Sequence, residues 1–170
     1  ESKRLKDASL KPTRANIEAA LGRVLKAAGK KDLVLAAFAG HGLEFDKDPG
    51  VYFCGTDARK KEPRSLVSLG ALYARMGECA AVHKVVLADC CRVDPNPARS
   101  RGADDVRANV PPKGVSVMYA CKSMQKAFEN DDLGHGYFFH HVLEAIRGKA
   151  AAKSGDLDLL ALAKHVAREV

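Results

Sequence analysis

The sequence predicts an α/β domain of three layers, with a mostly parallel sheet between two layers of helices. Three apolar runs, 33–38, 85–88 and 115–120, have the length and composition of strands. They are continuously apolar rather than alternating, as expected when helices cover both faces of a parallel sheet. Segments with apolar residues at helical spacing alternate with these runs, which favours the same architecture.

The chain has the size of one domain with a substantial core, because it has 170 residues of which 46% are hydrophobic. No internal repeat or low-complexity tract divides it. We therefore expect a single domain over residues 1–170.

Capping residues mark the predicted helices. The first begins after Thr13, whose hydroxyl can accept a hydrogen bond from the first turn, and it ends at Gly29. Ser68 holds the same position before a second helix, and Gly136 precedes a third. A further short strand is expected over 51–54. The third and fourth helices carry apolar residues at helical spacing: Phe138, Phe139, Val142, Leu143 and Ile146, then Leu159, Leu162, Val166 and Val170.

One long connection, 93–113, lacks a helix or strand pattern. It contains Pro95, Pro97, Pro111 and Pro112. Structureless loops beyond about 12–15 residues are uncommon in compact domains and are often functional or disordered. We expect a mobile, solvated loop here, which carries Arg99, Arg101 and Arg107.

Composition excludes several classes of function. The net charge is +7, but lysine and arginine are scattered and there is no tryptophan, so a nucleic-acid partner is not expected. No apolar stretch approaches the roughly 20 residues of a membrane span, so no membrane partner is expected either. Five cysteines form an odd number without framework spacing, which favours a reducing, cytoplasmic location.

A histidine and a cysteine each follow a predicted strand. His41 lies in Phe38-Ala39-Gly40-His41-Gly42, and Cys91 lies in Leu87-Ala88-Asp89-Cys90-Cys91-Arg92. Open α/β sheets place their sites at the carboxyl ends of strands. A free thiol is only partly ionised at neutral pH, so a nearby imidazole can activate it as a nucleophile. The pair therefore predicts nucleophilic catalysis at this edge of the sheet.

In this order of segments the sequence resembles the caspase-like superfamily of cysteine peptidases, particularly its bacterial caspase-like, metacaspase and paracaspase branches. The roughly 50 residues between histidine and cysteine match the spacing of caspases. The resemblance implies a caspase-like α/β/α sandwich and a cysteine endopeptidase that needs no cofactor. It runs through segments 13–17, 32–42, 52–58, 85–92, 119–121 and 134–138.

The resemblance also assigns roles to individual residues. It implies that Cys91 attacks the scissile carbonyl to form a thioester, and that His41 protonates the leaving amine. The backbone N–H groups of Gly42 and Cys91 would form the oxyanion hole, where loss of one donor typically costs about 10²–10³ in rate. Glycine suits position 42 because the chain passes close to the substrate there.

Asp89 carries the predicted specificity. In the metacaspase and paracaspase branches the acid two residues before the nucleophile lines the pocket for a substrate Arg or Lys. A carboxylate in a partly buried pocket is best complemented by a cation, so we expect protein or peptide substrates cleaved after a basic residue. Lys126 departs from the pattern, because paracaspases place a further acidic residue near that position. The nearby acids that could replace it are Glu129, Asp131 and Asp132.

Two alternatives remain open. The first is a catalytically silent caspase-like module that binds partners or regulates, and the second is a caspase-type enzyme directed to Asp. The resemblance implies that the first strand, the first helix and the second strand of the fold precede residue 1. We therefore expect an N-terminal segment or a partner chain to complete the domain.

The remaining histidines and cysteines have simpler explanations. His135 also lies in a His-Gly pair, but it precedes a helix instead of following a buried strand. His41 is therefore favoured as the catalytic histidine. His140 and His141 are adjacent and should face different directions on a helix, which argues against shared metal ligation. The spacing of a typical zinc site is also missing, so no metal is expected. Surface positions are expected for His83 and His165, and packing roles for Cys54, Cys79, Cys90 and Cys121.

Overall fold

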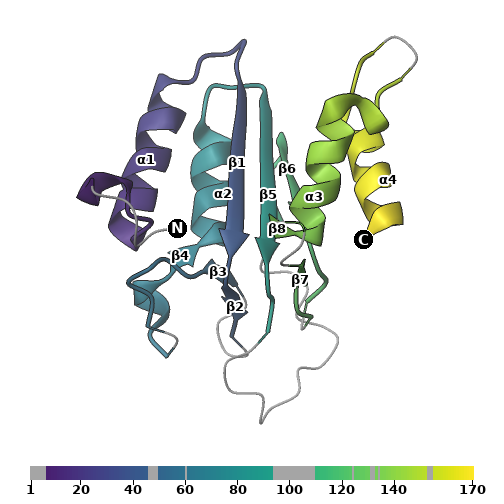
Figure 1. Ribbon diagram of the computed structural model, residues 1–170. Helices are drawn as coiled ribbons and strands as arrows, with labels where there is room; N and C mark the ends of the chain where they lie inside the picture. Colours follow the sequence, from purple (N-terminus) through teal and green to yellow (C-terminus); the bar gives the residue numbers. More distant parts are fainter. Residues whose placement is uncertain are drawn as a thin grey trace.

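The computed structural model confirms the predicted α/β architecture. It describes residues 7–45, 50–59, 61–93, 110–123, 125–130, 133, 135–152 and 155–170. Within this part of the chain, the predicted helices and strands appear in the expected order. Figure 1 shows the central sheet standing between two pairs of helices.

The central sheet contains three parallel strands in the order β1-β5-β6. Its strands are β1 (Leu33–Gly40), β5 (His83–Cys90) and β6 (Val115–Tyr119). In the register of β1 and β5, Gly40 lies opposite Cys90. The carboxyl ends of these two strands are therefore level, and the residues that follow them leave the sheet side by side.

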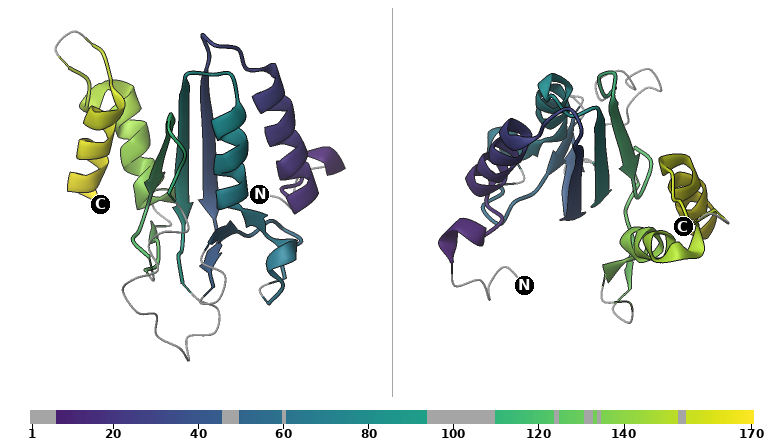
Figure 2. Two further views of the ribbon diagram at one scale, coloured as in Figure 1. Left: turned by 180° about the vertical axis from the view of Figure 1, so that it is seen from behind. Right: turned by 90° about the horizontal axis from the view of Figure 1, so that it is seen from above.

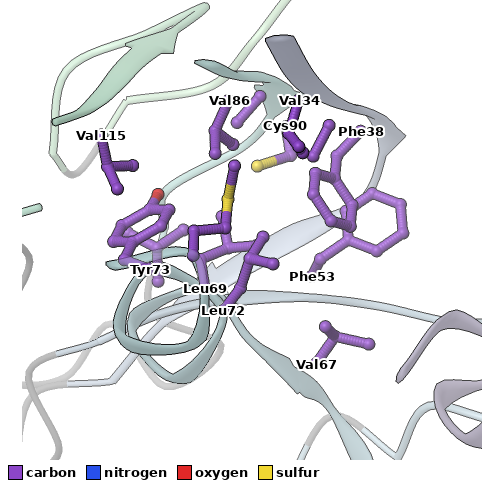
Figure 3. Packing of buried hydrophobic residues seen from close by; sticks show 14 of the residues in the cluster. Val34, Phe38, Phe53, Val67, Leu69, Leu72, Tyr73, Val86, Cys90 and Val115 are labelled. Carbon is purple, nitrogen blue, oxygen red and sulfur yellow. The ribbon is translucent and has the colours of Figure 1, made fainter. Parts of the chain in front are cut away.

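The helices α1 (Arg14–Ala27) and α2 (Leu69–Glu78) cover one face of the sheet (Figure 2). Both begin as predicted: the Thr13 hydroxyl accepts a hydrogen bond from the Asn16 N–H, and the Ser68 hydroxyl accepts one from the Ala71 N–H. Side chains of α2 and the sheet form a common core, shown in Figure 3. Its labelled members include Val34, Phe38, Leu69, Leu72, Tyr73, Val86 and Cys90.

The opposite face is covered by α3 (Tyr137–Glu144) and α4 (Leu159–Glu169), which pack against β5 and β6 (Figure 2). The apolar residues of this second core are Val85, Leu87, Phe138, Val142, Ala145, Leu162 and Val166. Ile146 belongs to the apolar residues at helical spacing in the predicted third helix, but it is not part of this core. It lies in the π-helical turn Ala145–Lys149 and is 55% exposed, because the chain leaves the helix at Gly148, where φ is 109°.

Strand β1 corrects the expectation that helices cover both faces of every strand. Its side chains alternate between buried and exposed, and Leu33 and Leu35 are 62% and 51% exposed. The helices α3 and α4 stand over β5 and β6 instead of over β1, as the view from above shows (Figure 2). The apolar run of β1 therefore does not reflect burial on both sides within the described structure.

Short elements gather beyond the carboxyl ends of the central strands (Figure 1). A small antiparallel sheet follows β1 directly, and a two-stranded ladder precedes α3. These elements frame the edge of the sheet at which the predicted site residues lie. They are β2 (Gly42–Glu44), β3 (Val51–Phe53), β4 (Val67–Ser68), β7 (Glu129–Asn130) and β8 (His135–Gly136), with 3-10 turns at Ala8–Leu10 and Pro63–Ser65.

Most of the predicted mobile loop 93–113 lies outside the described residues, including Arg99, Arg101 and Arg107. Its first residue, Val93, forms an isolated parallel bridge with Leu43. No described helix has the length and apolar character required to span a membrane.

Because of the buried Cys90 thiol, the stability of the fold should decrease as the pH rises above about 9. Burial raises the pKa of this thiol from 9.0 to about 12, and the residue is 0% exposed. Above pH 9 the unfolded chain loses this proton while the folded chain keeps it, so stability falls as pH rises from the unfolded toward the folded pKa. Between pH 8 and pH 10 we expect a loss of about 1 kcal/mol from this group.

Urea unfolding under reducing conditions at the two pH values measures this loss. Cys90→Ala should be less stable at pH 8 but should lose less stability on going to pH 10. Cys79→Ala, which removes a partly exposed thiol, should retain the wild-type dependence. An unchanged pH dependence in Cys90→Ala would contradict the assignment.

Candidate active site

His41 and Cys91 lie directly after β1 and β5. Because Gly40 is opposite Cys90 in the register, the next residue of each strand leaves the sheet at the same level. His41 is exposed and Cys91 is partly buried. The His41 carbonyl accepts a hydrogen bond of 2.9 Å from the Cys54 N–H, which ties the histidine turn to the end of β3. The two predicted catalytic residues are thus held by neighbouring strands.

Gly42 lies against the backbone of the cysteine segment. A Cβ atom at this position would lie 2.5 Å from the Cys91 carbonyl oxygen and 2.8 Å from the Cys90 sulfur. Real Cβ atoms do not approach a backbone oxygen so closely, so any side chain would push the two loops apart. The absence of a side chain lets the backbone after His41 approach the backbone at Cys91.

Hydrogen bonds also hold the cysteine loop from its other side. The Arg92 N–H donates to the Gln125 carbonyl at 2.9 Å. The Cys91 thiol lies 3.9 Å from the Ala127 carbonyl oxygen, a long and weak sulfur contact. Residues 125–127 therefore form one wall beside the thiol.

A buried polar network starts at Arg92. Its guanidinium lies 3.5 Å from a carboxylate oxygen of Glu44, and it stacks 4.4 Å from the centre of the Tyr119 ring. The Ser123 hydroxyl donates to the same Glu44 carboxylate at 3.0 Å. The Tyr119 and Tyr73 hydroxyls are hydrogen bonded, and burial raises the pKa of both phenols. The network therefore connects β2, which follows His41, to the residue after Cys91.

The comparison with protein families agrees with this geometry. A family model described as a caspase domain matches residues 3–170. This chain belongs to the caspase-domain family. No curated protein gave a significant match. The caspase domain is a cysteine peptidase domain that acts on proteins, and the predicted α/β fold and family resemblance are confirmed.

Asp89 of this caspase domain lies on β5 and faces the α3 side of the sheet. The residue is 6% exposed. Gly136, at the start of α3, packs directly on its carboxylate, and a Cβ there would lie 3.1 Å from Asp89 Cγ. A cavity of about 250 Å³ opens beside it. Its walls are formed by Asp89, Ala120, Lys126, Phe128, Tyr137, Phe138, Glu169 and Val170.

Lys126 lines the same cavity as Asp89. This is the residue at which the sequence departs from the acidic pocket residue of paracaspases. Of the acids expected to replace the missing carboxylate, Asp131 and Asp132 lie outside the described residues, and so does the side chain of Glu129. Glu169, from the last turn of α4, also lines the cavity, and its carboxylate is paired with Arg168 at 2.9 Å. Sequence inspection did not identify it, because nothing local connects the end of α4 to β5.

Of the histidines other than His41, some lie where they were expected and others do not. His83 is exposed as predicted, but His165 is 7% exposed and faces the second core, so its predicted surface position was wrong. The expectation that His140 and His141 face apart was also wrong. Both rings reach Glu144, at 3.5 and 3.0 Å, because residues three and four positions before a helical carboxylate flank it on one face. The side chain of His135 lies outside the described structure.

Proposed function

We propose that this caspase domain is a cysteine endopeptidase that cleaves after Arg or Lys, with Cys91 as nucleophile and His41 as its acid–base partner. The observation that carries the proposal is the register of β1 and β5, which brings the two residues out of neighbouring strands at the same level. Family membership supports the reaction class. The backbone contact at Gly42 supports a shared substrate site between the two loops.

In the proposed mechanism, the Cys91 thiolate attacks the scissile carbonyl carbon. The backbone N–H groups of Gly42 and Cys91 donate to the oxyanion, which they stabilise more strongly than the ground-state carbonyl. His41 gives its proton to the leaving amine, and a thioester remains on Cys91. Water, deprotonated by His41, then attacks the thioester and releases the acid product and the thiol.

The charges around the cavity support a basic substrate residue. Asp89 is a buried carboxylate on its walls, and Lys126 brings one cation; the Glu169 carboxylate also lines the cavity but is paired with Arg168 at 2.9 Å. An arginine or lysine side chain would complement the Asp89 carboxylate. The rings of Phe128 and Tyr137 supply apolar surface for the methylene groups of that side chain.

The proposed reaction needs a reduced thiol. The five cysteines form no disulfide within the part of the chain that the structure describes. We therefore propose a reducing compartment such as the cytoplasm. The test below is designed for reducing conditions.

Replacing Cys91 with alanine should abolish cleavage of fluorogenic peptides that end in Arg or Lys. Loss of a catalytic nucleophile can lower kcat by about 10⁶, so the residual rate should fall below detection. Cys79→Ala is the matched control, because this thiol follows α2 at the opposite end of the sheet and lies 3.4 Å from the Leu25 carbonyl. Circular dichroism should show that both variants remain folded.

Each alternative has its own outcome in this experiment. Cleavage after Asp, lost in Cys91→Ala, would retain the nucleophile but contradict the role of Asp89. Equal activity in Cys91→Ala and wild type would contradict the nucleophile itself. A folded, reduced protein that cleaves no peptide in either form would favour the silent interaction module.

A further inference from the structure

A cluster of nitrogen and oxygen ligands lies on α3, on residues that the proposed peptidase reaction does not use. His140 Nε2 is 3.5 Å and His141 Nδ1 is 3.0 Å from the two oxygens of the Glu144 carboxylate. One ligand atom from each residue lies within 4.8 Å of the other two. Ligands at about 2.0–2.2 Å from a tetrahedral zinc ion are separated by about 3.3–3.6 Å. The cluster is therefore close to a ligand arrangement without any movement of the backbone.

A second observation comes from α4. His165 is 7% exposed, and neither of its ring nitrogens has a hydrogen-bond partner among the described residues. Its ring lies against the His141 ring, with centroids 6.2 Å apart. Buried polar atoms nearly always have a partner, and one without a protein partner indicates a bound water or ion. His165 is not one of the three residues whose ligand atoms lie within 4.8 Å of one another, so it adds a buried, unpartnered imidazole beside the α3 cluster and is not yet in ligating position.

Lys149 is the present partner of the Glu144 carboxylate. Its ammonium donates a hydrogen bond to the Glu144 carboxylate. The Lys149 side chain is 62% exposed, so a metal ion can displace it into water at little cost.

We propose that His140, His141 and Glu144 of α3, with His165 of α4, form a binding site for a zinc-class divalent metal ion. Imidazole and carboxylate are common ligands for such an ion, and His165 would complete a tetrahedron after its ring turns toward the three α3 ligands. The bound ion would link α3 to α4 and would stabilise the folded state in proportion to its concentration. The proposal is independent of the peptidase reaction, because none of these residues belongs to the proposed dyad.

Titration with zinc chloride followed by calorimetry tests the site. Reduced Cys91→Ala protein is used, since the reactive thiol beside His41 could itself bind zinc. We expect saturable binding of one equivalent, and Glu144→Gln or His140→Gln should weaken it at least about tenfold. His83→Asn, an exposed histidine at the far end of β5, is the matched control and should bind as before. No saturable binding, or binding unchanged in both ligand variants, would overturn the proposal.

His165→Phe separates a ligand from a merely buried histidine. In the absence of metal, this variant should have a higher Tm, because it removes two buried polar atoms that lack partners. Zinc should raise the Tm of the wild type more than that of the variant. An equal zinc-induced rise in both would overturn the assignment of His165. Zinc-dependent shifts of the His140, His141 and His165 ring signals in NMR would locate the ion even if the other variants failed to fold.

Discussion

Asp89→Asn is expected to lower kcat/KM for peptides with Arg before the scissile bond by about 10²–10³-fold, or about 3–4 kcal/mol. Asp89 is 6% exposed and lines the cavity beside the cysteine loop, so a substrate cation there would be paired in a poorly solvated place. Asparagine keeps the shape of the aspartate side chain, but it is neutral and cannot compensate the positive charge of the substrate arginine. Cleavage assays with matched Arg and Leu peptides measure the change in preference.

Lys126, in the same cavity, provides a control whose replacement should change kcat/KM in the opposite direction. Lys126 shares the cavity walls with Asp89 and competes with a cationic substrate for its charge. Lys126→Ala should therefore raise kcat/KM for Arg peptides and leave Leu peptides nearly unchanged. If Asp89→Asn lowered the rate for both peptides equally, Asp89 would act by supporting Gly136 and the start of α3 and not by recognising charge.

Local signals in the sequence were sufficient to predict the strands and the helix starts. Continuous apolar runs identified β1, β5 and β6, and the side chains of Thr13 and Ser68 form the predicted caps. Each of these features depends on residues within a few positions. The proposed dyad depends on the same kind of signal, because His41 and Cys91 each follow such a strand directly.

Features that depend on long-range packing were not predictable in this way. Glu44 lies in a short strand and contacts Arg92 only because β2 turns back beside the cysteine loop. His165 was expected at the surface, but it lies three positions after the buried Leu162 on α4 and packs beside His141. The exposure of Leu35 likewise depends on where α3 and α4 stand, which the composition of β1 does not encode.

Glu44→Ala is expected to reduce stability by about 3–5 kcal/mol, because it leaves the partly buried charge of Arg92 without its carboxylate. Glu44 is 4% exposed, and its carboxylate contacts both Arg92 and the Ser123 hydroxyl. The same change should lower kcat by about 10²-fold. The Glu44–Arg92 pair joins the strand after His41 to the residue after Cys91, and a displacement of the proposed catalytic groups by about 1 Å is enough for such a loss. Urea unfolding and peptide cleavage on the same preparation measure both effects.

The double variant Glu44→Met/Arg92→Met distinguishes a buried charge from a general loss of packing. Removing both charges should cost less stability than removing Glu44 alone, because no uncompensated ion remains. Glu62→Ala is the exposed control: its partner Arg59 lies 3.1 Å away, but the two side chains are 57% and 73% exposed, so a loss below about 1 kcal/mol is expected. If the double variant were as active as wild type, the pair would serve stability alone. The position of the His41 and Cys91 loops would then depend on the Gly42 contact and on the backbone hydrogen bond from Arg92 to Gln125.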